Sequence, residues 1–158
     1  MYAEGIGVPP NDSLAIKWYM AAAEKDESRA LCQMGIYYAK QDSAKNLKKS
    51  ELKKSQAFKN LLRAAEQGVP EAQIRVAEYY ATGRYVKKSR KKAFVWYERV
   101  AQNGHLPAQE FIAECYEKGR GTIKNDENAY NWYKKAAEQG SEKGKIKAKE
   151  YELFKFYK

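Results

Sequence analysis

Apolar and small residues recur along this chain at steps of three and four, the spacing that places side chains on one face of an α-helix. Ala15, Trp18, Tyr19, Ala22 and Ala23 form one such stripe, and residues 129–137 repeat it. A shorter stripe of the same period runs over 72–80. No alternating strand pattern competes with these stripes, so the pattern predicts helices. Alanines set between aromatic residues suit helices that approach closely and interlock.

The helical phrase occurs four times, as KWYMAAAEKD at 17–26, KNLLRAAEQG at 59–68, VWYERVAQNG at 95–104 and NWYKKAAEQG at 131–140. Self-similarity at a fixed period of this length is the signature of stacked repeats. We therefore predict an all-α fold, an α/α solenoid of stacked helix–turn–helix repeats. The expected repeats are a partial one at 1–26 that supplies a second helix, then 27–68, 69–104 and 105–140, with a capping helix at 141–158.

The fullest copy of the motif spans residues 116–140 and resembles the Sel1-like repeat, a relative of the tetratricopeptide repeat. Its matching positions are Tyr116, Gly119, Gly121, Asp126, Ala129, Trp132, Tyr133, Ala136, Ala137 and Gly140. The start of the chain is similar, from Tyr2 to Tyr19, so the chain begins inside a repeat and looks cut from a longer protein. The resemblance implies a right-handed superhelix whose first helices line a concave, protein-binding face. We also expect a bacterial source.

Two repeats depart from the motif. Residues 39–54 replace the Gly-x-Gly turn with a polar segment six residues longer, and for 40–54 we predict a long, mobile loop or an irregular helical extension. Residues 83–92 keep the first glycine but place Tyr85 at the second and Arg90 at the aspartate. These changes affect the local turns and leave the predicted fold unchanged.

Composition adds little to this prediction. The chain has 158 residues, is 44% hydrophobic and 13% aromatic, and holds no apolar stretch long enough to span a bilayer. No signal peptide is visible in it. Cys32 and Cys115 occupy different positions in their repeats, so two buried free thiols are more plausible than a disulfide.

The sequence contains no catalytic constellation. His105 is the single histidine, which leaves a metal cluster or an acid–base pair without partners, and we expect it to be an exposed loop residue. The Gly-x-Gly pairs at 5–7 and 119–121 are explained by the repeat turn rather than by phosphate binding. We therefore predict a non-enzyme with no cofactor and no metal.

Positive charge concentrates in two turns. Residues 40–59 carry a net charge of +5 and residues 84–92 a net charge of +6, against +10 for the whole chain. Successive turns lie along one edge of a solenoid, so these residues should form a basic edge. The candidate anion-binding residues on it are Lys48, Lys49, Lys53, Lys54, Lys87, Lys88, Arg90 and Lys91.

The first helices carry the opposite charge. By analogy with tetratricopeptide arrays, positions at fixed offsets from each helix's apolar-small pair should line the concave face. The candidate partner-binding residues there are Arg29, Ile36, Ile74, Glu78, Glu110, Glu114 and Glu117. Such a mixed surface suits an extended or helical peptide with basic and apolar side chains, although a generic solvated helix face would have a similar composition.

Two functions remain open. The favoured one is a scaffold that holds a protein or peptide partner on the concave face, where the acidic residues would suit a basic partner. The alternative is a polyanion binder whose lysine-rich edge grips nucleic acid or anionic lipid. Against the alternative, only Phe58 and Tyr85 lie in or beside the edge as stacking platforms for bases.

The carboxyl-terminal segment is expected to close the array. In earlier repeats, Gly35, Ala77 or Ala113 stands where the two helices of a repeat touch, whereas the last copy has Lys149 there. A lysine would hold a further helix away, so 142–157 should form a closing helix with a polar outer face.

Overall fold

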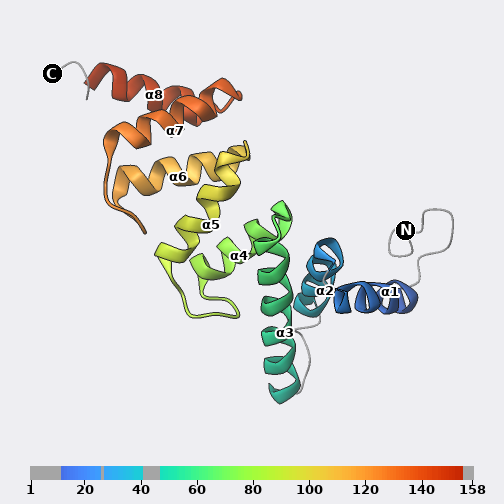
Figure 1. The fold of residues 1–158 in the computed structure, drawn as a ribbon. Coiled ribbons are helices and arrows are strands. Elements are labelled where there is room, and N and C mark those ends of the chain that lie inside the picture. The colour runs from blue at the N-terminus through green and yellow to red at the C-terminus, as the bar shows by residue number, and fades with distance from the viewer. Residues whose placement is uncertain (1–11, 26, 41–46, 155–158) are drawn as a thin grey trace. The chain divides into compact units, whose positions relative to one another are not determined.

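The computed structural model describes residues 12–25, 27–40 and 47–154. Every regular element in this part of the chain is an α-helix, which confirms the predicted all-α fold of stacked helix pairs (Figure 1). The helices are α1 (Asp12–Glu24), α2 (Ser28–Lys40), α3 (Leu47–Glu66), α4 (Pro70–Thr82), α5 (Arg90–Gln102), α6 (Leu106–Lys118), α7 (Asp126–Glu138) and α8 (Glu142–Phe154).

The chain divides into two compact units, Met1–Val76 and Ala77–Lys158, with the boundary inside α4. In unit 1, α2 packs against both α1 and α3. In unit 2, α6 packs against α5 and α7, and α7 packs against α8, so that α6, α7 and α8 lie stacked in Figure 1.

The six extra residues of the second repeat are accommodated in a helix. α3 has 20 residues, whereas α4 has 13. The first two turns of α3 are helical from Leu47 onward. The prediction of a loop is therefore wrong for residues 47–54. The alternative prediction of a helical extension is correct there, although the extension is a regular α-helix rather than an irregular one. Residues 41–46 lie outside the described part of the chain.

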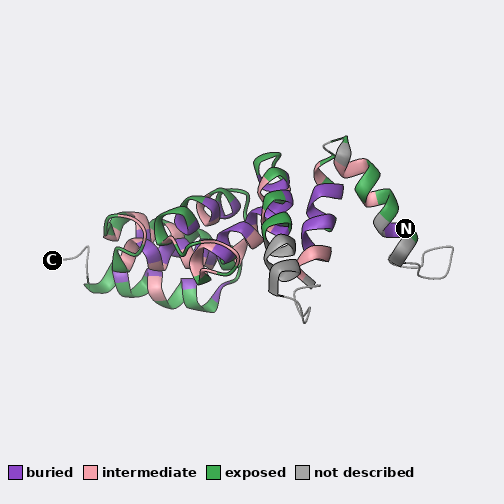
Figure 2. Cartoon of the chain, turned by 90° about the horizontal axis from the view of Figure 1, so that it is seen from below, coloured by how far each residue is buried: buried purple, intermediate pink, exposed green. Residues whose placement is uncertain are grey.

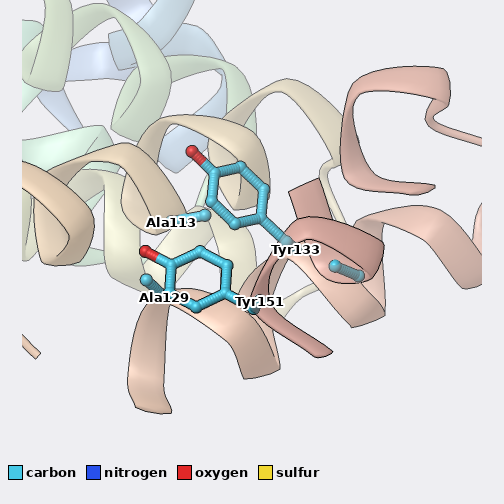
Figure 3. Packing of buried hydrophobic residues seen from close by; sticks show 5 residues of the cluster. Ala113, Ala129, Tyr133 and Tyr151 are labelled. Atoms are coloured by element: carbon cyan, nitrogen blue, oxygen red, sulfur yellow. The ribbon is translucent and has the colours of Figure 1, made fainter. Parts of the chain in front are cut away.

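Unit 2 is built from alternating alanines and aromatic rings. Ala113, Ala129, Tyr133 and Tyr151 form a buried cluster at the contacts of α6, α7 and α8, and the rings of Tyr133 and Tyr151 have centroids 6.2 Å apart (Figure 3). In Figure 2 the purple, buried stretches of the helices in unit 2 alternate with green, exposed ones. This alternation is what the three-and-four spacing predicted.

Gly144 allows the backbones of α7 and α8 to pack closely together. A Cβ atom at this position would lie 2.7 Å from the backbone nitrogen of Ala137 and 2.7 Å from the carbonyl oxygen of Tyr133. Only glycine permits this backbone approach, which places one side of α8 directly on α7.

Side chains cap the helices α6 and α7 of unit 2. Asp126 lies in the first turn of α7, while the capping side chain is Asn125, whose Oδ1 accepts from the Asn128 N–H at 2.8 Å. His105 is half-buried at the N-cap of α6, where its Nδ1 accepts from the Ala108 N–H at 3.2 Å. The expectation of an exposed loop histidine is wrong, because the ring satisfies an end-of-helix donor.

Two residue types behave as buried structural groups. Cys32 and Cys115 are free and buried, as predicted. Gln73 and Gln109 hold equivalent positions and are also buried; each donates from its side-chain amide to a carbonyl of the preceding helix, on Ala65 at 3.1 Å and on Ala101 at 3.2 Å. The sequence analysis missed these two amides.

Candidate binding surfaces

The three glutamates predicted on α6 share one side of that helix and meet α8. Ser141 Oγ hydrogen-bonds to Glu110 Oε1, and Lys143 Nζ forms an ion pair with Glu114. We call these contacts, with the one between Lys147 and Glu117, the α6–α8 ladder. The register predicted from the sequence thus brings the glutamates together, but α8 already offsets much of their negative charge.

The ladder is densest around Glu117. Lys147 Nζ lies 3.3 Å from Glu117 Oε1 and 3.0 Å from Glu150 Oε2, and the Tyr133 hydroxyl donates to Glu117 Oε2 at 3.0 Å. The hydrogen bond to Glu150, opposed by burial and reinforced by Glu117, raises the pKa of Lys147. Burial, followed by the bond to Glu117, raises the pKa of Tyr133 well above its ordinary value. Both groups therefore stay protonated and donate to the carboxylates.

Glu114 is held ionised by its neighbours. Burial alone would raise the pKa of its carboxyl group, but the hydrogen bond from Lys143 and the charges of Lys143 and Lys118 outweigh it. The pKa of Glu114 therefore lies below its ordinary value, and the group is an anion paired with two cations at neutral pH.

A cavity lies beside the ladder. Glu117, Glu150, Tyr151 and Phe154 line a cavity of about 210 Å³ between the ends of α6 and α8. The side chain of Phe154 is 68% exposed. Two carboxylates and two aromatic rings around one hollow suit a cationic side chain, which both group types attract.

α8 also presents apolar side chains to solvent. Ile146 is 60% exposed and Leu153 is 58% exposed. They are seven residues apart, hence on one side of the helix, and stand 36 residues after Glu110 and Glu117 in the repeat. The face positions predicted from the sequence ended with the fourth repeat, at Glu117. Extending these positions by one period would have placed Lys143, Ile146, Glu150 and Leu153 among the face residues.

The basic edge is exposed where the structure describes its side chains. Lys87, Lys88, Arg90 and Lys91 are all exposed, in the turn between α4 and α5 and at the start of α5. The guanidinium of Arg84 lies 4.9 Å from the ring centroid of Tyr85, which has a left-handed backbone with φ of 64°. The lysines predicted at 48, 49, 53 and 54 belong to α3 and not to a loop.

Two of the residues predicted to bind a partner in unit 1 have little exposed surface. Ile36 is 9% exposed, so it offers almost no surface to a partner, and Ile74 is half-buried. Arg29 lines a cavity of about 860 Å³ together with Trp18, Tyr19 and Glu71. The Trp18 side chain is 63% exposed. In unit 2, Glu78 is exposed on the last turns of α4.

Within residues 12–25, 27–40 and 47–154, no three His, Cys, Asp or Glu side chains gather in a way that could hold a metal ion. No helix in the same ranges is long and apolar enough to cross a membrane.

Comparison with known proteins identifies the repeat. The family model described as Sel1 repeat matches four times, at residues 1–27, 28–69, 70–105 and 106–141. Comparison with curated proteins finds no match.

Solved structures give the same result. A Sel1 repeat protein from Oxalobacter formigenes is 29% identical with a TM-score of 0.77, and the alignment covers 95% of this chain and 59% of that one. A protective antigen of uropathogenic Escherichia coli with an SLR fold is also 29% identical with a TM-score of 0.77, over 95% of this chain and 31% of the other. Cysteine-rich protein B of Helicobacter pylori, 23% identical with a TM-score of 0.55, shares the fold over 85% of this chain and 92% of its own. The chain thus spans roughly a third to three fifths of the first two proteins it resembles.

Proposed function

Because this chain belongs to the Sel1 repeat family of repeat scaffolds, we propose that it binds a protein partner, without catalysing a reaction, on a face formed by α6 and α8. The partner segment carries a basic side chain and apolar side chains. The face comprises the α6–α8 ladder, the cavity beside Glu117, and the exposed side chains of Ile146 and Leu153.

The observation that carries the proposal is the cavity lined by Glu117, Glu150, Tyr151 and Phe154. Its volume of about 210 Å³ accepts one side chain rather than a whole small molecule, since ligand pockets are typically about 300–1,000 Å³. A lysine or arginine entering it meets two carboxylates that share a single cation, Lys147, within the ladder. The phenyl ring of Phe154 supplies an aromatic surface for the same cation.

The apolar residues provide most of the affinity in this proposal. An exposed ion pair contributes only about 0–1 kcal/mol, whereas fully burying a leucine or isoleucine side chain contributes roughly 1.5–3 kcal/mol. Ile146 and Leu153 are more than half exposed, so a partner that covers both gains a substantial part of that amount. The charged groups chiefly set the orientation of the partner and its association rate.

A peptide library displayed on phage, selected against the intact chain, tests the proposal. We expect selected peptides to combine a basic residue with apolar residues. Their binding should weaken roughly tenfold or more in the variant that combines Ile146→Asp and Leu153→Asp. Ile123→Asp is the matched control, because Ile123 is 86% exposed, lies in the turn before α7 and does not line the cavity beside Glu117.

Two results would contradict the proposal. One is equal binding by the double variant and the Ile123→Asp control. The other is selected binding that disappears on reversal of Lys87 and Lys88 to glutamate while the α8 variants bind normally. That second result would assign the function to the basic edge and revive polyanion binding.

A further inference from the structure

A separate cavity in unit 2 lies where the basic edge meets α6. Its volume is about 170 Å³. The cationic residues around it are Lys88, Arg90 and Arg120, and the other lining residues are Ala81, Ala93, Phe111, Glu114 and Cys115. It is therefore a small hollow with a largely apolar floor and three cations at its walls.

Close backbone packing brings these cations together. A Cβ atom on Gly121 would lie 2.5 Å from the carbonyl oxygen of Arg90, and the φ of Gly121 is 82°. The turn after α6 thus presses directly on the first residue of α5. The neighbouring Arg120 is delivered to the same hollow as Arg90, although the two are 30 residues apart in sequence.

The three cations have no anionic partner of their own. In the described part of the chain, the side chains of Lys88, Arg90 and Arg120 make neither a hydrogen bond nor an ion pair. Glu114 is the one acid among the described residues that line the cavity, and it is paired with Lys118 at 3.6 Å and with Lys143. Three cations around a hollow repel one another unless an anion joins them.

The next repeat shows which group is missing. There the residues equivalent to Lys88 and Arg90 are Lys124 and Asp126, which lie 3.9 Å apart as an ion pair. Asp126 also occupies the first turn of its helix, where a carboxylate is favourable. Arg90 puts a cation at the equivalent place, so this repeat has the lysine of the pair but no carboxylate at the position of Asp126.

We propose that this cavity is a binding site for an oxyanion, a carboxylate or phosphoryl group, which Lys88, Arg90 and Arg120 hold while its carbon substituent rests on Ala81, Ala93 and Phe111. The group takes the place of the aspartate that the sister repeat carries. It comes either from a free small anion or from an acidic side chain of a protein partner. The second source rests on the proposed function, whereas the first is independent of it.

Titration of the intact chain with inorganic phosphate and with propionate, followed by NMR chemical shifts at constant ionic strength, tests the site. We expect saturable shifts at the amides around 88–93 and 119–121. Arg90→Asp should weaken binding about tenfold or more, because it removes a charge-assisted contact and restores an internal pair with Lys88. Lys91→Asp is the matched control, since it makes the same charge change one residue away at an exposed position outside the lining set.

Arg90→Asp should weaken anion binding without lowering thermal stability. Because it recreates the lysine–aspartate pair of the sister repeat, the variant should be at least as stable to heat as the original chain in phosphate-free buffer, and phosphate should no longer raise its melting temperature. Arg120→Gln, in a different turn, should also weaken anion binding and serves if Arg90→Asp fails to fold. A short peptide with one glutamate, compared with its glutamine counterpart, distinguishes the partner source from the free anion.

Three results would overturn the proposal. The first is the absence of saturable shifts with both phosphate and propionate. The second is equal weakening by Lys91→Asp and Arg90→Asp, which would indicate a diffuse charge effect. The third is tight binding of an oligothymidylate that Arg90→Asp and Lys91→Asp reduce alike, which would identify an extended nucleic-acid surface instead of a site. Loss of peptide binding with retained phosphate binding would contradict only the partner source.

Discussion

The contact between α7 and α8 makes a prediction that opposes simple helix propensity. Gly144 lies inside α8, and replacing a helical glycine with alanine ordinarily stabilises a protein by about 0.5–1 kcal/mol. Here the added Cβ would stand 2.7 Å from two backbone atoms of α7 and 3.1 Å from a third. Backbone atoms cannot rotate away as a side chain would, so α8 must shift.

The magnitude follows from the cost of overpacking. Forcing an extra methyl group into a filled interior costs about 1–3 kcal/mol, and Gly144 lies in the first turn of α8, where helix propensity adds little. Gly144→Ala should therefore destabilise the chain by about 1–3 kcal/mol. For a chain of this length that corresponds to a fall in melting temperature of roughly 2–12 °C. The ladder contacts of Lys143 and Lys147 should weaken with it, because both residues belong to the displaced helix.

Thermal and urea unfolding, followed by circular dichroism, measure the effect. The control compares Lys149→Ala with Lys149→Gly, an exposed position on the same helix, where alanine should be the more stable of the two. If Gly144→Ala is as stable as the original chain or more stable, the close packing of α7 on α8 is refuted. A higher stability of Lys149→Ala than of Lys149→Gly would show that the measurement detects the effect of helix propensity at a position where packing plays no part.

Three further predictions concern unit 2 and the buried thiols. The folded pKa of Glu114 lies below its ordinary value of 4.5, so its ion pairs stabilise the chain above that pH, and this stabilisation is lost as the pH falls through the folded pKa. Glu114→Gln should therefore lower the free energy of unfolding at pH 7 by about 0–1 kcal/mol and reduce the loss of stability on acidification to pH 3. Urea unfolding that shows the same loss on acidification in the variant as in the original chain would contradict this. Burial raises the pKa of Cys32 and of Cys115 to about 11, so little of the reactive thiolate is present at pH 8. Both thiols should therefore react slowly with a disulfide reagent in the folded chain and quickly in urea, and fast reaction of the folded chain would contradict their burial. Gly121→Ala should cost more stability than Gly119→Ala, because the two share a positive φ but only the first brings a Cβ against the backbone of Arg90; equal melting temperatures would contradict the close approach that assembles the oxyanion cavity.

Most of the fold could be predicted from the sequence because stacked repeats rely on local spacing. The stripe of small and aromatic residues identified the buried side of α7, where Ala129, Tyr133 and Ala136 are fully buried. The burial of these α7 residues depends on which face of the helix they occupy, and the helical period determines that. In α1 the same stripe was less reliable, because Ala15 is buried but Trp18 is 63% exposed. The burial of Cys32 and Cys115 was predicted on a different ground, that cysteine behaves as a small hydrophobe.

The helix at 47–54 was harder to predict because its residues lack an apolar stripe. Lysine, leucine and glutamate, which dominate this segment, are nonetheless good helix formers. Once residues 57–65 are anchored in the core, extending the helix backward adds one hydrogen bond per residue without a new nucleus. Low apolar content was therefore weaker evidence for a loop than it appeared.

The candidate sites depended on pairs that spacing cannot reveal. The register placed Glu110, Glu114 and Glu117 on one side of α6, but their partners Ser141, Lys143 and Lys147 belong to the next helix pair. The oxyanion cavity requires Arg120 to meet Arg90, which only the close approach of the Gly121 turn provides. That turn could be identified as glycine-rich from the sequence, but the residue it contacts could not.

The central claim is that the partner binds the face formed by α6 and α8, and amide hydrogen exchange with and without a selected peptide tests it most directly. The account predicts that the peptide slows exchange most strongly within 142–154 and next within 106–118, and leaves 47–66 unchanged. Strongest protection at 84–92, or in unit 1 alone, would contradict it and move the binding surface to the basic edge or to the cavity beside Trp18.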